Sequence, residues 1–527
     1  MRQRNWVLLM IVLASLLLRL GLMTLIENPG LNDQTHYYNL GQRLLNGEGF
    51  TIDYVWHYSA LPEDIVHPID HWMPLSGVAV ALGMAVFGEG ALPALAVFVL
   101  VGALLPVIVF ISAKQYGLED HTALIAAAFA ISLPDFVWNS LRSDSTILNM
   151  ALMSASIVAF VHGVRHADWR AYLLSGVIGG VAYLTRNDSI LLLPLVVSSG
   201  VVYLVAGKSF ARRGQLWQIA LVLVGFSVVV APWIVRNVQV LGMTGSPETS
   251  RMFFMVDAKD HYAYNIPLTL ETMFERKTSA EHLAKRLFEL AAALKQMLVS
   301  LDVLLPMFVG AGVLILLFER RREQLLIAVP TGLWVLGILI AYPLLLPYKS
   351  QSGSFEKAYL TIIPLLLPVA ALAVERIFKA DRWRDVIVVL TVIVMAANSY
   401  DLIRYETTRA NSFYAYIAQA VETAQALPDV SGDGEIRLMT QDPYIMSYYG
   451  ISSVMIPFTQ TREDVLAIAE RYGIDYLMMP AARPVLDPIF EQGETDPRFV
   501  YSDAVLDGNR TIFAFYGMYP GGVTDDE

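Results

Sequence analysis

The side chains best suited to chemistry gather in one polar stretch, residues 28–72, which follows the first apolar run of the chain. Near its start, Asp33 precedes apolar and aromatic residues at Tyr37, Leu40 and Leu44. This nearly helical spacing predicts a helix over 33–45 that lies on a membrane surface. Asp33 would begin that helix, where the helix dipole favours a carboxylate. It is therefore either a helix cap or a group that carries chemistry.

Histidines in the same stretch raise the question of a metal ion. His57, His67, Asp70 and His71 offer imidazole and carboxylate groups, which can bind a divalent ion. The spacing of four between His67 and His71 would place both on one helical face, but the intervening Pro68 disfavours a regular helix. Loop histidines beside aromatic residues also contact substrate, so a divalent metal ion is one of two alternatives. The expected substrate-binding residues are Tyr37, His67, His71 and Trp72.

A membrane must position these residues, because 55% of the 527 residues are hydrophobic and only 16% are charged. Ordinary soluble domains have about a quarter of their residues charged. The first run lacks a small-residue cleavage site, so we expect it to be retained as a helix. Several runs are shorter than the roughly 20 residues that a bilayer core needs. The eleven predicted spans are 6–26, 91–113, 121–138, 145–164, 171–185, 189–206, 216–235, 303–318, 324–346, 358–375 and 386–403.

The connections between these spans alternate in charge, and this alternation predicts the topology. Loops that carry an excess of Lys and Arg stay on the cytoplasmic side of a membrane. We therefore expect a protein of the plasma membrane whose N-terminus lies in the cytoplasm. The outward side then receives the loops 27–90 and 236–302 and everything after residue 404. The basic residues assigned to the inner side are Arg2, Arg4, Lys114, Arg165, Arg170, Lys208, Arg212, Arg213, Arg320, Arg321, Arg322, Arg376, Lys379, Arg382 and Arg384.

The tail forms a separate acidic module in this interpretation. Residues 405–527 hold 7 arginines, no lysine and 19 acidic residues, a net charge of −12. That charge argues against nucleic acid as a partner. Alternating apolar residues predict strands over 435–440, 453–457 and 475–479, a helix over 461–472 and a hairpin over 499–516. We therefore expect a transmembrane domain, 1–404, and a small extracytoplasmic α/β domain, 405–527. The absence of cysteine excludes disulfides and thiolate metal sites.

Several short motifs, in their order along the chain, resemble those of the GT-C membrane glycosyltransferases. The run Asn32-Asp33-Gln34-Thr35-His36-Tyr37, followed by Gly47-Glu48-Gly49-Phe50, is similar to the first outward loop of that class. The closest likeness is to protein O-mannosyltransferase and aminoarabinose-transferase enzymes. The turn Arg142-Ser143-Asp144-Ser145 resembles a second acidic position, and Thr185-Arg186-Asn187-Asp188 resembles a later loop. Two departures stand out: Gln34 holds a place that is often Glu, and Lys357 holds one that is often Arg.

The resemblance implies transfer of a sugar from a polyprenyl-phosphate donor to a hydroxyl of a protein, lipid or glycan acceptor outside the membrane. Such a reaction needs a base for the acceptor proton, a role that falls to Asp33, with Asp144 as the second catalytic acidic residue. It also needs cations for the leaving phosphate. Arg186, Arg142 and Lys357 are the expected donor-phosphate ligands.

Structural roles compete with each of these assignments. Arg186 could anchor a helix end by extending to the membrane surface. Asp144 and Asp188 could cap the helices that follow them. Arg19, within the first span, is costly in a membrane unless it finds a partner, and it is a third candidate for the phosphate. An amphipathic helix over 280–297 either borders a lipid-access groove or packs against neighbouring spans.

Two other classes of function remain open. A transporter would show ionisable groups at the membrane midplane and paired broken helices in two halves. The sequence has prolines within helices but no paired halves, and its polar residues gather in the outward loops. A non-catalytic receptor or assembly subunit would instead use the acidic module to bind a partner.

Overall fold

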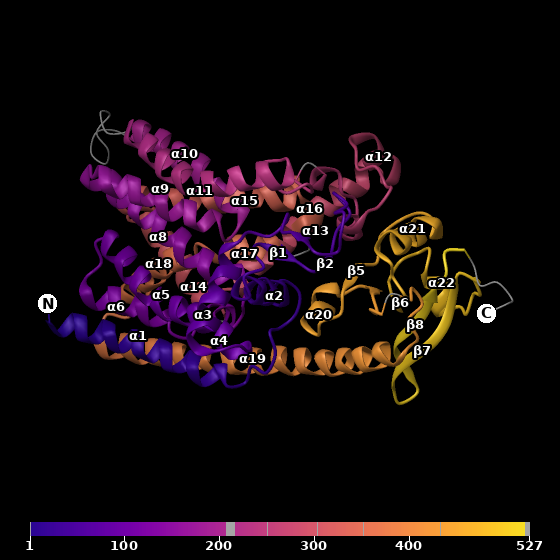
Figure 1. Cartoon of the computed structure of the whole chain (residues 1–527). Coiled ribbons are helices and arrows are strands. Elements are labelled where there is room, and N and C mark those ends of the chain that lie inside the picture. The colour runs from indigo at the N-terminus through magenta and orange to yellow at the C-terminus, as the bar shows by residue number, and fades with distance from the viewer. Residues whose placement is uncertain are drawn as a thin grey trace.

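The computed structural model describes residues 2–206, 217–249, 251–302, 304–350, 353–432 and 434–521. A helical bundle occupies the left of Figure 1, and a module that contains strands lies at its right-hand end. The predicted fold class, a polytopic helical membrane protein with a small α/β domain, is confirmed.

Each predicted span overlaps a helix or a pair of helices, and the last, 386–403, lies within a longer helix; residues 216 and 303, at the start of two spans, lie outside the described residues. In the described residues, seven helices are long and apolar enough to cross a membrane, or up to nine if each bent pair counts as one span. The predicted count of eleven is not confirmed, because α9 and α14 have only 15 and 14 residues. The helices of the bundle are α1 (Arg2–Met23), α5 (Ala96–Gln115), α6 (Asp120–Phe129), α7 (Pro134–Ser140), α8 (Ser145–His166), α9 (Trp169–Tyr183), η1 (Asn187–Leu191), α10 (Leu192–Ala206), α11 (Ile219–Leu241), α14 (Leu305–Phe318), α15 (Arg322–Leu339), η5 (Ile340–Leu345), α17 (Ser354–Leu360), α18 (Ile363–Ile377) and α19 (Asp381–Ala426).

Glycines bring the short helix α9 against α11. A β-carbon on Gly176 would lie 2.2 Å from the carbonyl oxygen of Val222, and one on Gly225 would lie 2.6 Å from that of Leu173. Small residues of this kind let helix backbones approach closely in membranes. Protein neighbours therefore cover much of α9, which reduces its need for a full-length span.

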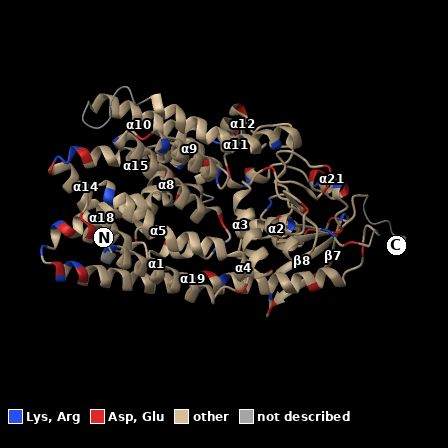
Figure 2. Ribbon diagram, turned by 60° about the vertical axis from the view of Figure 1, so that its left-hand side comes forward, with Lys and Arg blue, Asp and Glu red and all other residues tan. Residues whose placement is uncertain are grey.

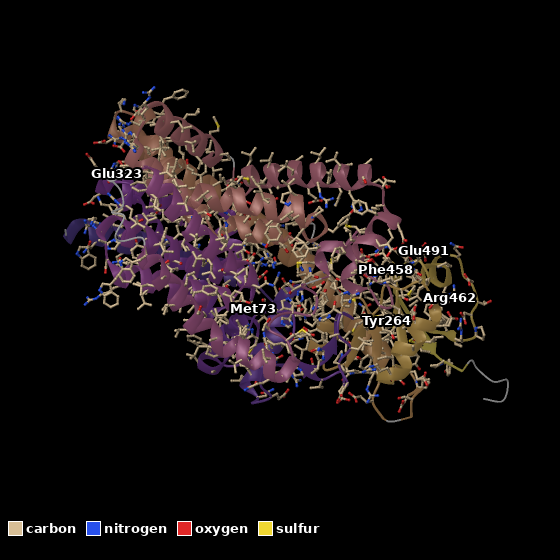
Figure 3. All side chains as sticks on the ribbon, turned by 90° about the horizontal axis from the view of Figure 1, so that it is seen from above. Met73, Tyr264, Glu323, Phe458, Arg462 and Glu491 are labelled. Carbon is tan, nitrogen blue, oxygen red and sulfur yellow. The ribbon has the colours of Figure 1, made fainter. Side chains whose placement is uncertain are left out.

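Charged connections meet at the end of the bundle that is far from the strand-containing module (Figure 2). Glu323 marks that end in Figure 3. This shared location agrees with the predicted alternation of loops, whereas the side that faces the cytoplasm stays a prediction. Lys208, Arg212 and Arg213 lie outside the described residues. Three ion pairs join the connections: Arg4 with Asp120 at 3.3 Å, Arg165 with Glu323 at 2.7 Å and Arg376 with Glu319 at 3.2 Å.

Arg19 stabilises a break in the bundle. The helices α6 and α7 meet at an angle of 60°. The buried guanidinium of Arg19 donates hydrogen bonds to the carbonyl oxygen of Ile131, within the break, and to the hydroxyl of Ser140, each at 3.0 Å. These bonds satisfy main-chain and side-chain groups deep in the bundle. Arg19 does not line the cavity described below.

We call the loops 27–90 and 236–302 the first and the second outward loop, after their predicted side of the membrane. The first outward loop contains α2 (Asp33–Leu45), whose bounds match the predicted helix. The apolar segment after it forms α3 (Leu75–Phe87), which packs on α2 where Leu40 meets Gly77. The remaining elements of the two loops and their surroundings are β1 (Thr51–Ile52), β2 (Tyr54–Val55), β3 (His67–Pro68), α4 (Ala91–Ala94), η3 (Met252–Phe254), η4 (Ala258–Tyr262), α12 (Leu270–Arg276), α13 (Ser279–Val299) and α16 (Pro347–Ser350).

The amphipathic helix α13 turns its apolar face away from the protein. Leu283 and Leu287 are 58% and 56% exposed, whereas Glu289 is buried and pairs with Lys285 at 2.7 Å. An apolar face that is exposed while a charged pair is buried fits a helix in contact with lipid. Met297, at the end of the same face, is partly buried and packs against the core of the bundle, so the exposed part of the face is its first part.

The C-terminal module contains the predicted strands and one strand that was not expected. Its six strands have the order β2-β5-β4-β6-β8-β7, so β2 of the first outward loop extends the sheet by pairing in parallel with β5. The long helix α19 runs through position 404 without a break, along the bottom of Figure 1. The domain boundary at 404 stays a prediction. The elements of the module are β4 (Leu438–Thr440), α20 (Pro443–Tyr448), β5 (Ser453–Met455), α21 (Arg462–Tyr472), β6 (Tyr476–Met479), α22 (Asp487–Glu491), β7 (Phe499–Asp507) and β8 (Arg510–Met518).

Candidate active site

A cavity of about 1000 Å³ opens between the bundle, the two outward loops and the C-terminal module. Met73 belongs to its lining and lies in Figure 3 between Glu323, at the far end of the bundle, and Arg462 in the module. Side chains from segments far apart in the sequence meet here. The ionisable lining residues other than tyrosine are Asp33, Asp70, His71, Arg142, Arg186, Asp188, His261, Lys349, Glu356 and Lys357.

Asp33 is the first residue of α2, and Asn32 holds the N-cap position. The Asp33 carboxylate accepts hydrogen bonds from Nε1 of Trp72 at 3.0 Å and from Nζ of Lys357 at 2.7 Å. Its side chain is 36% exposed, so a molecule in the cavity can reach it. Burial by itself would raise the pKa of Asp33, but the neighbouring Lys357 ammonium and the Trp72 hydrogen bond lower that pKa below its usual range.

Lys357 joins Asp33 to the second predicted carboxylate. Its Nζ lies 2.9 Å from Oδ2 of Asp144, in addition to its contact with Asp33. The ammonium group has three donors, which lets one lysine serve two carboxylates. Asp144 is completely buried, and the Lys357 and Arg142 charges lower its pKa although burial acts to raise it. Of the two carboxylates, only Asp33 is open to the cavity.

Arg142 lies beside this cluster. Its Nη2 is 3.2 Å from Oδ2 of Asp144, and its guanidinium lies over the Trp138 ring at 5.2 Å. With its amide oxygen toward the guanidinium, Gln34 accepts hydrogen bonds from Nε and Nη2 of Arg142 at 2.8 and 2.7 Å. A neutral side chain at position 34 leaves the positive charge of Arg142 only partly neutralised. The departure at Gln34 from the expected acidic residue thus favours anion binding.

Arg186 lines the cavity from the turn between α9 and η1. Its guanidinium forms a fork with Asp188, with Nη2 to Oδ2 at 2.7 Å and Nε to both carboxylate oxygens at 3.2 Å. The hydroxyl of Tyr342 donates to the same carboxylate at 2.8 Å. Asp188 therefore holds Arg186 in place. The alternative in which Arg186 only extends to the membrane surface does not match this geometry, since its side chain is 12% exposed.

Of the predicted substrate-binding residues, Tyr37, His71 and Trp72 line the cavity and His67 does not. Trp72 is oriented by His36, whose ring stacks on it with centroids 3.8 Å apart. The Nδ1 of His67 instead contacts the carbonyl oxygen of Ile65 at 2.8 Å, within its own loop.

The histidine-rich loop does not assemble the metal ligands that its sequence suggested. His57 pairs with Asp70 at 3.1 Å, and His71 pairs with Glu248 of the second outward loop at 3.0 Å. Among the residues that the structure describes, no group of three or more such side chains could hold a metal ion. Of the four expected ligands, His57 and Asp70 pair with each other, His71 pairs with Glu248 and His67 contacts the main chain.

Sequence reasoning missed the contribution of the second outward loop and the module. Glu248, His261 and Tyr262 come from the loop, and Tyr444 from the module. The hydroxyl of Tyr444 donates to Oδ1 of Asn32 at 2.8 Å and so contacts the residue before Asp33. These residues belong to no motif. The pairing of β2 with β5 joins the module to the first outward loop, and a bridge between Ala263 and Phe458 joins the second outward loop to the module.

The cluster combines an accessible carboxylate with three cations, each of which is paired with a carboxylate of the site. Such a site can accept a proton from one reactant and stabilise negative charge on another. These are the requirements for displacing a phosphate-linked group by a hydroxyl.

The chain is similar to one family model and to several solved structures. A family model described as dolichyl-phosphate-mannose-protein mannosyltransferase matches residues 66–235. No curated protein matches the sequence. The apo structure of ArnT from Cupriavidus metallidurans is 16% identical, covers 98% of each chain and has a TM-score of 0.62. The same enzyme bound to undecaprenyl phosphate has a TM-score of 0.60, at 16% identity, with coverage of 97% of this chain and 98% of the other.

An archaeal oligosaccharyltransferase, AglB from Archaeoglobus fulgidus in complex with an inhibitory peptide and a dolichol-phosphate, is also similar. It is 11% identical with a TM-score of 0.53, and the match covers 97% of this chain and 74% of that one. The likeness to both structures extends over almost the whole of this chain. The chain is therefore an integral membrane protein with the GT-C glycosyltransferase fold.

Proposed function

We propose that this protein is a membrane glycosyltransferase that moves a sugar from a polyprenyl-phosphate donor to an acceptor hydroxyl, with Asp33 as the general base. The observation that carries the proposal is the cavity in which an accessible carboxylate, Asp33, meets Lys357, Arg142 and Arg186. The GT-C fold supports it, as do the lipid phosphates bound by ArnT and AglB.

In the proposed reaction, the acceptor oxygen attacks the anomeric carbon of the donor sugar. The bond from that carbon to the phosphate oxygen breaks, and the acceptor proton passes to the Asp33 carboxylate. The departing polyprenyl phosphate takes the electron pair, and the cations of the site stabilise its charge. Arginine suits this task because its planar fork matches phosphate oxygens.

Donor binding would also prepare the base. Without ligand, pairing with Lys357 lowers the pKa of Asp33 despite its burial, which makes the carboxylate a weak base. A phosphate in the cavity competes for the Lys357 ammonium and excludes water. Both effects raise the pKa of Asp33 toward a value suited to proton transfer. The acceptor is therefore deprotonated only when the donor is in place.

Asp144 acts indirectly in this proposal. Because it is sealed from the cavity, it positions Lys357 and Arg142 rather than meeting the substrate. Asp188 does the same for Arg186. Tyr37, His71 and Trp72 contact the substrate. His67 does not line the cavity, so it does not belong to the substrate-binding residues.

The proposed location is the plasma membrane, with the N-terminus inside and the cavity and C-terminal module outside. The basic loops at the opposite end of the bundle support this orientation. The transferred sugar is a hexose or a pentose, and the acceptor hydroxyl belongs to a protein, a lipid or a glycan.

The test uses the purified full-length protein in lipid nanodiscs. It is incubated with polyprenyl-phosphate mannose or a polyprenyl-phosphate pentose, and release of polyprenyl phosphate is measured. We expect slow hydrolysis to water and faster turnover with an acceptor. Turnover of nucleotide sugars instead, or transport of a sugar into liposomes without cleavage of any donor, would contradict the proposal.

A further inference from the structure

One wall of the cavity is built from aromatic and imidazole rings that the donor chemistry leaves unused. We call Trp56, His71, Trp72, His261 and Tyr262 the aromatic wall; all five line the cavity. The Trp56 ring is the centre of the wall, with ring centroids 4.8 Å from Trp72, 4.8 Å from His71 and 5.7 Å from Tyr262. The wall begins next to the base, because Nε1 of Trp72 donates to Asp33.

Glu248 fixes the two imidazoles of this wall. Its side chain is 1% exposed, and its two oxygens contact Nδ1 of His71, at 3.0 Å, and Nδ1 of His261. A carboxylate only accepts hydrogen bonds, so in each neutral imidazole the Nδ1 atom carries the proton and Nε2 has a free lone pair. Burial lowers the pKa of His71 although Glu248 acts to raise it, which keeps that imidazole neutral.

Two polar atoms of the wall have no partner among the described residues: Nε2 of His261 and Nε1 of Trp56. His261 is 7% exposed. Both atoms have almost no surface open to the cavity, and buried polar groups without a partner are rare in native structures, so we expect a bound molecule to reach them after a small rotation of the two rings. In the neutral imidazole of His261, Nε2 accepts a hydrogen bond, whereas Nε1 of Trp56 donates one. A hydroxyl group does both.

The main-chain groups beside the aromatic wall, where the second outward loop meets the module, already bond to one another. The amide of Phe458 donates to the carbonyl oxygen of Tyr262 at 2.8 Å, and the amide of Tyr264 donates to that of Phe458 at 2.9 Å. Phe458 and Tyr264 lie close together in Figure 3, where the second outward loop meets the module. An extended peptide would need free main-chain groups along this edge. A ring that bears hydroxyls needs only the side chains.

We propose that the aromatic wall binds the acceptor and that the acceptor is a carbohydrate. Its ring lies against the apolar faces of Trp56 and Trp72, and its hydroxyls bond to Nε2 of His261 and Nε1 of Trp56. Contact with Trp72 brings a neighbouring hydroxyl to Asp33. This inference rests on the proposed function, since it names the acceptor class for the same site.

The experiment compares acceptors with the full-length protein in nanodiscs and polyprenyl-phosphate mannose as donor. The probes are methyl mannoside, methyl galactoside, methyl glucoside and their disaccharides, set against a blocked hexapeptide that contains serine. We expect at least one glycoside to accelerate release of polyprenyl phosphate and to appear as a glycosylated product. His261→Ala should raise the acceptor KM about tenfold, the effect of losing one positioned hydrogen bond, with less than a twofold change in donor KM.

Trp56→Ala should raise the acceptor KM similarly, whereas His121→Ala and Trp169→Ala, two exposed positions on other helices, should leave both constants unchanged. Should His261→Ala unfold the protein, His261→Gln retains a polar group and gives the same comparison. Wild-type hydrolysis without any acceleration by glycosides, together with transfer to the peptide, would overturn the inference but not the proposed function. Absence of wild-type turnover with both the mannose and the pentose donor would instead overturn the proposed function.

Discussion

Replacement of Asp33 by Asn removes the base while leaving the surrounding contacts almost intact. The amide oxygen can still accept from Nε1 of Trp72, and Lys357 keeps its ion pair with Asp144 at 2.9 Å. Because the Asp33 side chain is 36% exposed, loss of its ion pair should cost less than about 1 kcal/mol of folding stability. The chemical step should lose about 10² to 10⁴ in rate, which corresponds to about 3 to 5 kcal/mol of barrier.

The assay is single-turnover transfer from a radiolabelled polyprenyl-phosphate sugar in nanodiscs, with thermal unfolding measured on the same preparation. Asp401→Asn is the matched control, because it makes the same chemical change at an exposed position of α19. We expect the control to behave as the wild type. An Asp33→Asn variant that is folded and transfers sugar at the wild-type rate would refute the assignment of the base.

Three further predictions concern the charges around Asp33. Arg186→Lys loses the fork to Asp188 and should reduce the rate of sugar transfer by about 10 to 100 fold. Treatment of the wild type with a chelator should change that rate less than about twofold. A fully active variant, together with loss of wild-type activity in the chelator, would favour a metal instead. Asp144→Asn leaves Lys357 and Arg142 without a buried counter-charge and should destabilise the fold by about 3 to 5 kcal/mol, measured by thermal unfolding; an unchanged unfolding temperature would contradict the buried ion-pair network. In the folded protein, ion pairing lowers the pKa of Asp33 and of Asp144, although burial acts to raise it. The two ionised carboxylates therefore stabilise the fold at neutral pH, and this contribution to the free energy of unfolding is lost as the pH falls below about 4, the usual pKa of Asp. Unfolding measured from pH 7 to 3 should show this loss, and the Asp144→Asn variant should show less of it.

Local patterns in the sequence predicted the local structure well. The helix over 33–45 follows from helical spacing behind Asp33, and the hairpin around Asp507 follows from alternation on both sides of an Asp-Gly turn. The break between α6 and α7 was missed within one apolar run, although Pro134 marks the start of the second helix. Apolar content predicts burial in a membrane but carries no information on bends.

The assembly of the site depended on contacts that no local pattern encodes. Lys357 and Asp33 are 324 residues apart, and their ion pair joins α17 to the first residue of α2. The strand β2 has two residues, too few for any alternation to appear, yet it joins the first outward loop to the module. Glu248 and His261 come from the second outward loop and enter the site through the contact of Glu248 with His71, which no local pattern predicts, so the aromatic wall was not foreseen.

The most direct test of the account is a structure of the full-length protein with polyprenyl phosphate bound in nanodiscs. The account predicts that the phosphate lies within hydrogen-bonding distance of Lys357, roughly 3 Å, and that Arg142 and Arg186 also bind it. It also predicts that Asp33 has separated from the Lys357 ammonium with which it pairs in the structure without ligand. A phosphate bound outside this cavity, with the ion pair between Asp33 and Lys357 unchanged, would contradict it.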